Sequence, residues 1–261
     1  MRLVDSHSHF DVADFDDDRE AALARARAAG VDTQVLPAYV ASGWERLRET
    51  CAGHDGLHAA YGLHPVYLDD HRPADLDALP GWISRERPCA VGECGLDWFI
   101  DRPDRERQRA ILVRQLELAK DFDLPVILHA RRAVDDVTAA IRRIGGLRGV
   151  VHSFAGSDQQ ADALFALGFH IGIGGPVTYE RASRLRRIVA NMPLEFLLLE
   201  TDSPDQPMHG HRGARNEPAF LVEVLRVVAQ LRGESEERVA EATTANAERL
   251  FDLQEGREPR P

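Results

Sequence analysis

The feature that most constrains the fold is an alternation of short apolar runs with longer stretches of helical periodicity. The apolar runs have the length and composition of strands that are buried on both faces of a parallel sheet. They lie at residues 3–6, 34–38, 58–61, 90–93, 126–129, 149–152, 170–173 and 196–200.

The stretches between these runs carry apolar side chains at helical spacing. In the segment 105–121 they recur every three to four positions, and the segment 20–29 is followed by Gly30, a residue typical of helix C-termini. Further helices are predicted from Ser42 onward and at 158–167, 217–231 and 234–250. Eight β–α pairs predict a (β/α)8 TIM barrel with its active site at the C-terminal mouth of the strands. A doubly wound open sheet is the main alternative from the pattern alone.

The length fits a single barrel. A barrel of this kind takes about 250 residues, and the chain has 261. We expect one domain over residues 1–253, followed by a polar tail at 254–261 that frays. No apolar run reaches the roughly 18 residues of a membrane span, and the acidic start lacks the pattern of a signal peptide.

Cysteine usage and net charge narrow the class of protein further. The three cysteines, Cys51, Cys89 and Cys94, have no metal-type spacing, which fits reduced thiols in a cytoplasmic enzyme. The net charge of −11 argues against a broad basic face that coats a nucleic-acid duplex. A nucleic-acid substrate stays open, because metal cations and a few arginines in a cleft can hold phosphate locally.

Histidines and carboxylates stand at the ends of five predicted strands. Residues two apart in a strand point the same way, so His7 and His9 leave the first strand side by side. All strand C-termini of a barrel face one mouth, where six side chains should converge: His7, His9, Glu93, His129, His152 and Asp202. Four imidazoles and two carboxylates suit two divalent ions. The alternative is a set of polar core residues with internal partners.

Six segments form an ordered series of motifs: DSHSHF at 5–10, GLHP at 62–65, GECGLD at 92–97, LPVILH at 124–129, HSFAG at 152–156 and LETDSP at 199–204. This series resembles the TatD family of metal-dependent hydrolases, which belongs to the amidohydrolase superfamily. The resemblance covers residues 3–251. Cys94 departs from the family pattern, which has an aliphatic residue there, and we expect it to be packed. The resemblance implies a (β/α)8 barrel, two divalent metals and deoxyribonuclease activity, often from a 3′ end.

The resemblance also implies a ligand set. It assigns a first ion to His7, His9 and Asp202, a second to His129 and His152, and a bridging role to Glu93. Some related barrels bridge their ions with a carboxylated lysine, but the only lysine, Lys120, lies inside a predicted helix. The identity of the metal stays open. Histidine-rich sites suit zinc, manganese or nickel, and mixed carboxylate sites also accept magnesium.

Two close cations lower the pKa of a shared water and neutralise a phosphodiester. We expect Asp202 to act either as the general base for that water or as a plain ligand. His64 is a substrate-binding candidate, through a phosphate or through a hydrogen bond to a metal ligand. Arg131 and Arg132 are candidates for phosphate binding, with one of them pointing into solvent. Glu200 is expected to support the network at the strand ends.

The resemblance therefore implies a deoxyribonuclease with 3′–5′ exonuclease activity. We expect single-stranded DNA as its substrate, because a narrow acidic mouth cannot engulf a duplex. No membrane and no obligate protein partner is inferred. The first alternative is a metal-dependent hydrolase of a small cyclic amide, ester or lactone, since such a metal site is not tied to phosphate. The second is a non-catalytic scaffold, which would not need all six ligand-type residues. The segment 210–216 is either a phosphate-binding wall of the mouth or a solvated loop.

Overall fold

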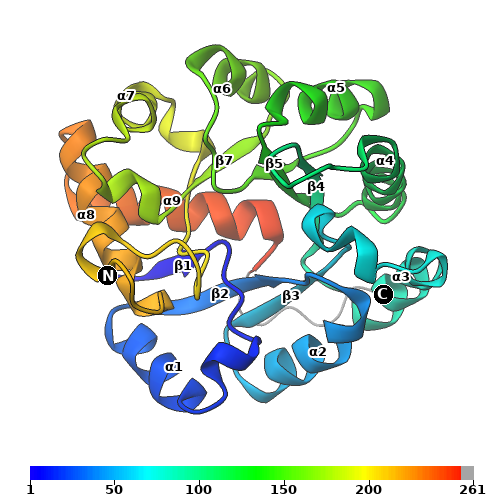
Figure 1. The fold of residues 1–261 in the computed structure, drawn as a ribbon. Coiled ribbons are helices and arrows are strands. Elements are labelled where there is room, and N and C mark those ends of the chain that lie inside the picture. Colours follow the sequence, from blue (N-terminus) through cyan, green and yellow to red (C-terminus); the bar gives the residue numbers. More distant parts are fainter. Residues whose placement is uncertain (254–261) are drawn as a thin grey trace.

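Eight parallel strands form the centre of the molecule (Figure 1). The computed structural model describes residues 1–253, so the predicted fraying of 254–261 lies outside the described residues. The strands follow one another around the sheet in chain order. They are β1 Leu3–Asp5, β2 Val31–Pro37, β3 Leu57–Tyr61, β4 Ala90–Asp97, β5 Val126–Arg131, β6 Gly149–Val151, β7 His170–Ile173 and β8 Leu197–Leu199.

The first and last strands meet at their carboxyl ends. The Ser6 N–H donates to the Leu199 carbonyl at 3.0 Å, and the Asp202 N–H donates to the His7 carbonyl at 2.9 Å. Every sequential pair from β1 to β8 is parallel. The fold is therefore the predicted (β/α)8 TIM barrel and not an open sheet.

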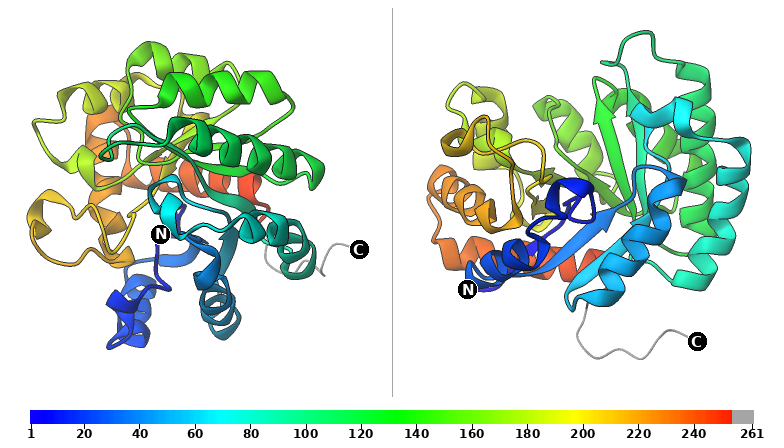
Figure 2. Two further views of the ribbon diagram at one scale, coloured as in Figure 1. Left: turned by 45° about the vertical axis from the view of Figure 1, so that its right-hand side comes forward. Right: turned by 60° about the horizontal axis from the view of Figure 1, so that its bottom comes forward.

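Helices form a ring outside the strands (Figures 1 and 2). They are α1 Arg19–Ala28, α2 Trp44–Gly53, α3 Pro73–Glu86, α4 Arg105–Asp121, α5 Val134–Ile144, α6 Asp158–Phe165, α7 Ser183–Asn191, α8 Leu221–Arg232 and α9 Glu236–Phe251. Short 3-10 helices occupy the connections at Ala13–Phe15, Ala41–Gly43, Pro65–Asp70, Gly175–Thr178, Leu194–Phe196, His209–His211 and Pro218–Phe220.

Several elements differ from the predicted bounds by a few residues, and for β4 and α8 the local reason is clear. β4 continues four residues past Glu93 to Asp97, where Gly95 allows a close approach to β5. A Cβ on Gly95 would lie 2.0 Å from the His129 carbonyl oxygen. The helix predicted from residue 217 begins at Leu221, because Pro218 starts a separate 3-10 turn.

The amino end of the barrel is filled by apolar side chains and covered by α9, which reaches the middle of the ring in Figure 1. Every strand except β7 contributes one residue to this cluster, and the last turn of α9 and Leu253, two residues beyond it, supply the rest. The members are Val4, Val35, Ala60, Ala90, Ile127, Val150, Leu198, Ala247, Leu250, Phe251 and Leu253. This amino end, which we call the foot of the barrel, is therefore closed. The end at the strand carboxyl termini is open.

All three cysteines are free thiols, and Cys94 is buried with its Sγ 3.8 Å from the Ile127 carbonyl oxygen. Within residues 1–253, no helix combines the length and the apolar character that crossing a bilayer requires.

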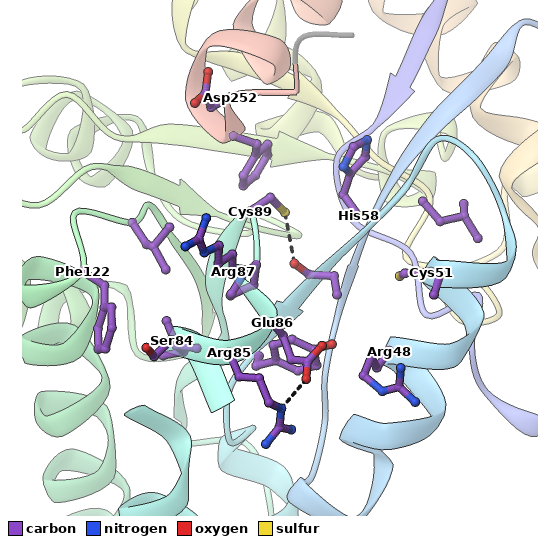
Figure 3. Close-up of a pocket in the computed structure, with 18 of the residues that line it drawn as sticks. Arg48, Cys51, His58, Ser84, Arg85, Glu86, Arg87, Cys89, Phe122 and Asp252 are labelled. Carbon is purple, nitrogen blue, oxygen red and sulfur yellow. Dashed lines mark hydrogen bonds and ion pairs between the residues drawn. The ribbon is translucent and has the colours of Figure 1, made fainter. Parts of the chain in front are cut away.

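A depression of about 1160 Å³ opens at the amino ends of β3, β4 and β5. Figure 3 shows it between the ends of α2 and α3, where Arg85 pairs with Glu86 and the Cys89 thiol donates to the Ala59 carbonyl. None of the six predicted metal ligands lines this depression. The depression lies at the opposite end of the barrel from the predicted metal ligands.

Candidate metal centre

The six predicted ligands converge at the carboxyl ends of the strands. Their donor atoms form groups in which all atoms lie within 4.8 Å of one another. One group is His7, His9 and Asp202, a second is His7, Glu93 and His152, and a third is His64, Glu93 and His129.

The first group comes from the segments that follow β1 and β8. The Nε2 atoms of His7 and His9 lie 3.1 Å apart, and each is 3.4 Å from Asp202 Oδ1. The other nitrogen of His9, Nδ1, is 3.1 Å from the Pro37 carbonyl oxygen. A carbonyl can only accept, so Nδ1 carries the proton and the Nε2 lone pair faces the group.

Glu93 joins the groups through its two oxygens. Oε2 lies 3.2 Å from His7 Nε2 and is buried without a hydrogen-bond partner. Oε1 lies 2.7 Å from His152 Nε2 and 3.1 Å from His129 Nδ1. The two oxygens of one carboxylate thus face different sets of imidazoles, which is the arrangement of a bridging ligand.

Asp97 orients His129 and was not identified from the sequence. His129 Nε2 lies 2.8 Å from Asp97 Oδ2, which leaves the Nδ1 lone pair directed at Glu93. The same carboxylate accepts the Phe99 N–H at 2.7 Å. Strand alternation could have found Asp97, since it lies four residues after Glu93 in β4 and therefore points to the same face.

His64 belongs to the cluster in a different way. The Val66 N–H donates to His64 Nδ1 at 3.1 Å, so the neutral ring carries its proton on Nε2. That nitrogen is 2.9 Å from Glu93 Oε1 and donates to it. Burial lowers the pKa of His64 to about 4 in spite of the neighbouring Glu93, so the ring is neutral. The geometry favours the predicted hydrogen bond to a metal ligand.

Glu200 lies behind His152. Its Oε1 accepts the Ser153 N–H at 2.5 Å and is 3.7 Å from His152 Nδ1. A Cβ on Gly172 would lie 2.0 Å from Glu200 Oε2, so only glycine leaves room for this carboxylate. Glu200 therefore supports the strand-end network, as expected.

Both carboxylates of the centre are ionised. Burial alone would raise the pKa of Glu93, but the surrounding imidazoles, that of His152 foremost, hold that pKa well below its usual range. Burial also opposes ionisation of Asp202, whose pKa is nevertheless lowered to about 2 by the adjacent His9 and by the other surrounding histidines.

These donors fit divalent metal ions. Imidazole lone pairs and ionised carboxylate oxygens point at common positions, and such mixed sets suit first-row metals. The buried Glu93 Oε2 has no hydrogen-bond partner, and a buried charged oxygen without a partner is costly. A cation beside it would remove that cost.

A cavity of about 790 Å³ opens over these donors. Its walls include Tyr39, Tyr67, Arg131, Arg181 and Arg184. None of these arginines forms an ion pair with the part of the chain that is described. Arg184 donates to the Ala155 carbonyl at 3.0 Å, and Arg131 lies 3.8 Å from the centroid of the Phe99 ring.

The remaining substrate-binding candidates separate in space. Arg131 lines the cavity, whereas Arg132 lines an adjoining one. In the segment 210–216, His211 pairs with Glu223 at 2.6 Å and Arg215 pairs with Asp18 at 2.6 Å. Those two side chains hold the loop to the helices, which favours its interpretation as a structural loop.

Tyr39 is a second residue of the mouth that sequence reasoning missed. Its ring stacks on that of His9 with centroids 3.9 Å apart, and it lines the cavity. Val35 in β2 faces the barrel interior, and Tyr39 follows it by four residues. The same alternation that relates His7 to His9 therefore predicts Tyr39 on the inner face.

The backbone is unusual at the same end of the barrel. Arg132, Ser153 and Asp202 have φ values of 55°, 44° and 58°, and they follow β5, β6 and β8. Left-handed conformations of non-glycine residues cost on the order of 1–3 kcal/mol and concentrate at functional sites. Other described non-glycine residues also have positive φ, among them Arg87 and Asp252 at the opposite end, so these turns shape the mouth loops without by themselves marking a functional end.

Comparison with known proteins agrees with this site. The sequence matches the family model described as TatD related DNase over residues 4–252. It is 44% identical over 256 residues to the Escherichia coli K12 protein named "Uncharacterized metal-dependent hydrolase YjjV", covering 97% of this chain and 98% of that one. The crystal structure of E. coli YjjV, a TatD homologue, superposes with a TM-score of 0.93 at 42% identity, covering 97% of this chain and 99% of that one.

A mouse relative, named "Putative deoxyribonuclease TATDN3", is 34% identical over 265 residues, covering 96% of this chain and 88% of that one. The family match spans nearly the whole described chain, and its near relatives carry the name of metal-dependent hydrolases. The chain therefore belongs to the TatD family and is a metal-dependent hydrolase.

Proposed function

We propose that this hydrolase is a cytoplasmic deoxyribonuclease that removes nucleotides from the 3′ end of single-stranded DNA with the aid of two divalent ions. The observation that carries the proposal is the set of arginines beside the metal ligands. Arg131, Arg181 and Arg184 line the cavity and form no ion pair within residues 1–253. In a chain of net charge −11, unpaired guanidinium groups at this position favour an anionic substrate, and their forked donors suit phosphate.

The proposed ligand sets use the two faces of Glu93. His7, His9 and Asp202 would hold one ion, and His129 and His152 a second. Glu93 Oε2 faces the first set and Oε1 the second, which supports a bridging role. Bound there, the ions would acidify the attacking water and offset the charge that develops on the phosphate oxygens.

Asp202 is the proposed proton acceptor. Its pKa of about 2 keeps it ionised at neutral pH. The Gln206 side-chain amide donates to Oδ2, while Oδ1 faces His7 and His9. A carboxylate fixed in this way can orient the water and take its proton.

Other mouth residues would bind the phosphodiester. Arg131 and Arg184 are placed to donate to its non-bridging oxygens. Burial, together with the charges of Asp202 and Glu93, raises the pKa of Tyr39, so its hydroxyl stays protonated and can donate to a substrate oxygen. His64 acts on the reaction through Glu93, to which it donates.

The depth of the centre supports a single strand as the substrate. Asp202 is 8% exposed, His9 2% and Glu93 1%. A free strand end can reach such a floor, whereas the phosphates of an intact duplex are held apart from it by the paired strand.

The test uses metal-stripped protein with zinc, manganese, magnesium or nickel added back. The substrates are end-labelled single-stranded DNA, duplex DNA, RNA and a bis-aryl phosphodiester. We expect 5′-labelled single strands to shorten one nucleotide at a time and 3′ label to be released as mononucleotide from the start. Hydrolysis of a lactone or cyclic amide far faster than any of these diesters would overturn the proposal and favour the small-molecule alternative.

A further inference from the structure

A second cavity continues from the mouth. It has a volume of about 460 Å³ and shares Ala130, Arg131, Ala155, Gly156 and Arg184 with the cavity over the metal ligands. We call it the distal cavity. Its lining residues lie beyond the carboxyl ends of β4 and β5 and at the start of α5. Figure 1 shows where these three elements lie in the barrel. Arg131 and Arg184 thus border both cavities.

Phe99 supports a pair of arginines in the distal cavity. Its side chain is 45% exposed, and the Cζ atoms of Arg131 and Arg132 lie 3.8 Å and 4.5 Å from its ring centroid. A guanidinium group over an aromatic ring is held by the charge distribution of the ring. Its N–H edges stay free to donate to an anion.

The charges that face the distal cavity are mainly positive. Asp136 already pairs with Arg109 at 3.0 Å, and Asp135 accepts the Gln160 side-chain amide at 2.9 Å. The three arginines that line this cavity, two of them over Phe99, have no ion-pair partner among the described residues. The distal cavity is therefore lined by three guanidinium groups without an ion-pair partner within residues 1–253 and by one carboxylate, that of Asp135, without a cationic partner there.

The backbone holds this arrangement in place. Arg132 has a left-handed φ of 55°, and α5 begins two residues later at Val134. Asp97 accepts the N–H groups of Phe99 and Ile100 at 2.7 Å and 3.1 Å, and it also bonds His129. The loop that carries Phe99 is thus fixed to the same carboxylate that orients a proposed metal ligand.

We propose that the distal cavity binds a second phosphate of the substrate strand, the one on the 5′ side of the cleaved linkage. Arg132, which lines only the distal cavity, donates to that phosphate, while Arg131 and Arg184 line both cavities and lie between it and the cleaved phosphate. Phe99 is a positioning residue for Arg131 and Arg132. The inference rests on the proposed nuclease function. Binding of a second phosphate makes that site selective for polynucleotides. A diester with a single phosphate leaves the distal cavity empty.

The test compares two trinucleotides, TpTpT and the same molecule with a neutral methylphosphonate at its 5′ linkage. Both keep the 3′ linkage that is cut. For the unaltered enzyme, kcat/KM should be roughly tenfold or more higher for the charged molecule, as for a lost bond to a charged group. Phe99→Ala and Arg132→Ala should reduce this preference to less than about twofold. Phe99→Tyr should retain it.

Arg142→Ala is the matched control, because it removes an exposed arginine of α5 that does not line either cavity. Its preference should equal that of the unaltered enzyme. A preference that survives in Phe99→Ala and Arg132→Ala overturns the second phosphate site while the nuclease function stands. If Phe99→Ala lowers kcat/KM equally for both trinucleotides, Phe99 acts by stacking on a base. That result would also overturn the second phosphate site.

A binding measurement separates this inference from the nuclease proposal. Fluorescence anisotropy of a short single strand with metal-free protein gives the dependence of affinity on salt. Arg132→Ala should lower the slope of log K against log salt by about 0.7, the value for one phosphate contact in a single strand. If no diester is cleaved but the slope falls, only the nuclease function fails. An unchanged slope overturns the phosphate contact.

Discussion

At the scale of single residues, the partners of the imidazole rings decide which nitrogen atoms can hold a metal. The Pro37 carbonyl accepts the Nδ1–H of His9, and Asp97 accepts the Nε2–H of His129. The Val66 N–H has the opposite effect on His64 and leaves it as a donor to Glu93. Residue types suggested the ligands, but these partners come from other segments and depend on how the chain packs.

The first prediction concerns Asp202→Asn. The amide keeps the shape and one coordinating oxygen, but it loses the negative charge and the basic oxygen. Turnover should fall by about 100- to 10,000-fold, while the protein folds and still binds a short oligonucleotide. Asp205→Asn, a neighbouring carboxylate of the same cavity, is the control and should keep most activity. Near-normal turnover of Asp202→Asn at saturating metal would exclude the base role.

The second prediction concerns Asp97→Asn. Asparagine is a weaker acceptor for the His129 N–H, so His129 should bind its ion less tightly. Metal affinity should fall by about 10- to 100-fold, measured as activity against metal concentration. High metal should restore most of kcat, which a folding defect would not allow. An unchanged metal dependence would show that the Asp97 bond does not position His129.

At the scale of elements, the apolar runs predicted the strands well because each strand is buried on both faces. α4 and β7 have the predicted bounds, Arg105–Asp121 and His170–Ile173. The helical periodicity predicts no bounds for α3, α5 or α7. α3 contains Pro80 in its interior, and an internal proline is usually a sign that a helix has ended.

The loops at the mouth were the least predictable part of the site. Strand alternation reaches Tyr39 and Asp97, which lie two residues beyond β2 and at the end of β4. It stops where the backbone turns left-handed, as at Arg132 and Asp202. Beyond those turns the direction of a side chain depends on tertiary contacts, so the position of Arg132 over Phe99 could not be derived from spacing.

The third prediction concerns His170, the first residue of β7. Burial and the nearby Arg249 lower the pKa of His170 from its ordinary value of 6.5, although backbone hydrogen bonds oppose the shift. The folded protein therefore keeps the ring neutral while the unfolded chain takes up a proton below about pH 6.5. The stabilising contribution is complete above that pH and is lost as the pH falls below it.

His170→Gln should accordingly lose less stability than the unaltered protein between about pH 7 and pH 5. The difference is at most about 1.4 kcal/mol per pH unit. Urea unfolding of chelator-treated protein at both pH values measures it, with the histidines of the mouth common to both proteins. Identical pH dependence in the two proteins would show that His170 ionises freely in the folded state.

At the scale of the whole molecule, the two ends of the barrel have different tasks. The foot is closed by apolar side chains and α9, and it carries none of the proposed ligands. The mouth collects buried histidines and carboxylates from both ends of the chain, from His7 to Asp202. The apolar foot contributes stability, whereas burying histidines and carboxylates at the mouth costs free energy. Bound metal ions would offset that cost.

The last prediction follows from that cost: metal removal should lower stability as well as activity. Ions that bind only the folded protein stabilise it by mass action, by about 2.7 kcal/mol for one site at a hundredfold excess over Kd. Chelated protein should therefore be inactive and melt at a lower temperature, and titrated zinc or manganese should raise Tm until about two ions are bound. His129→Ala should show a smaller rise, because it lacks one proposed ligand. Arg142→Ala should behave like the unaltered protein. A chelated, metal-free preparation that keeps full activity and an unchanged Tm would refute the metal centre itself, since buried Glu93 and its histidines would then be satisfied without any ion.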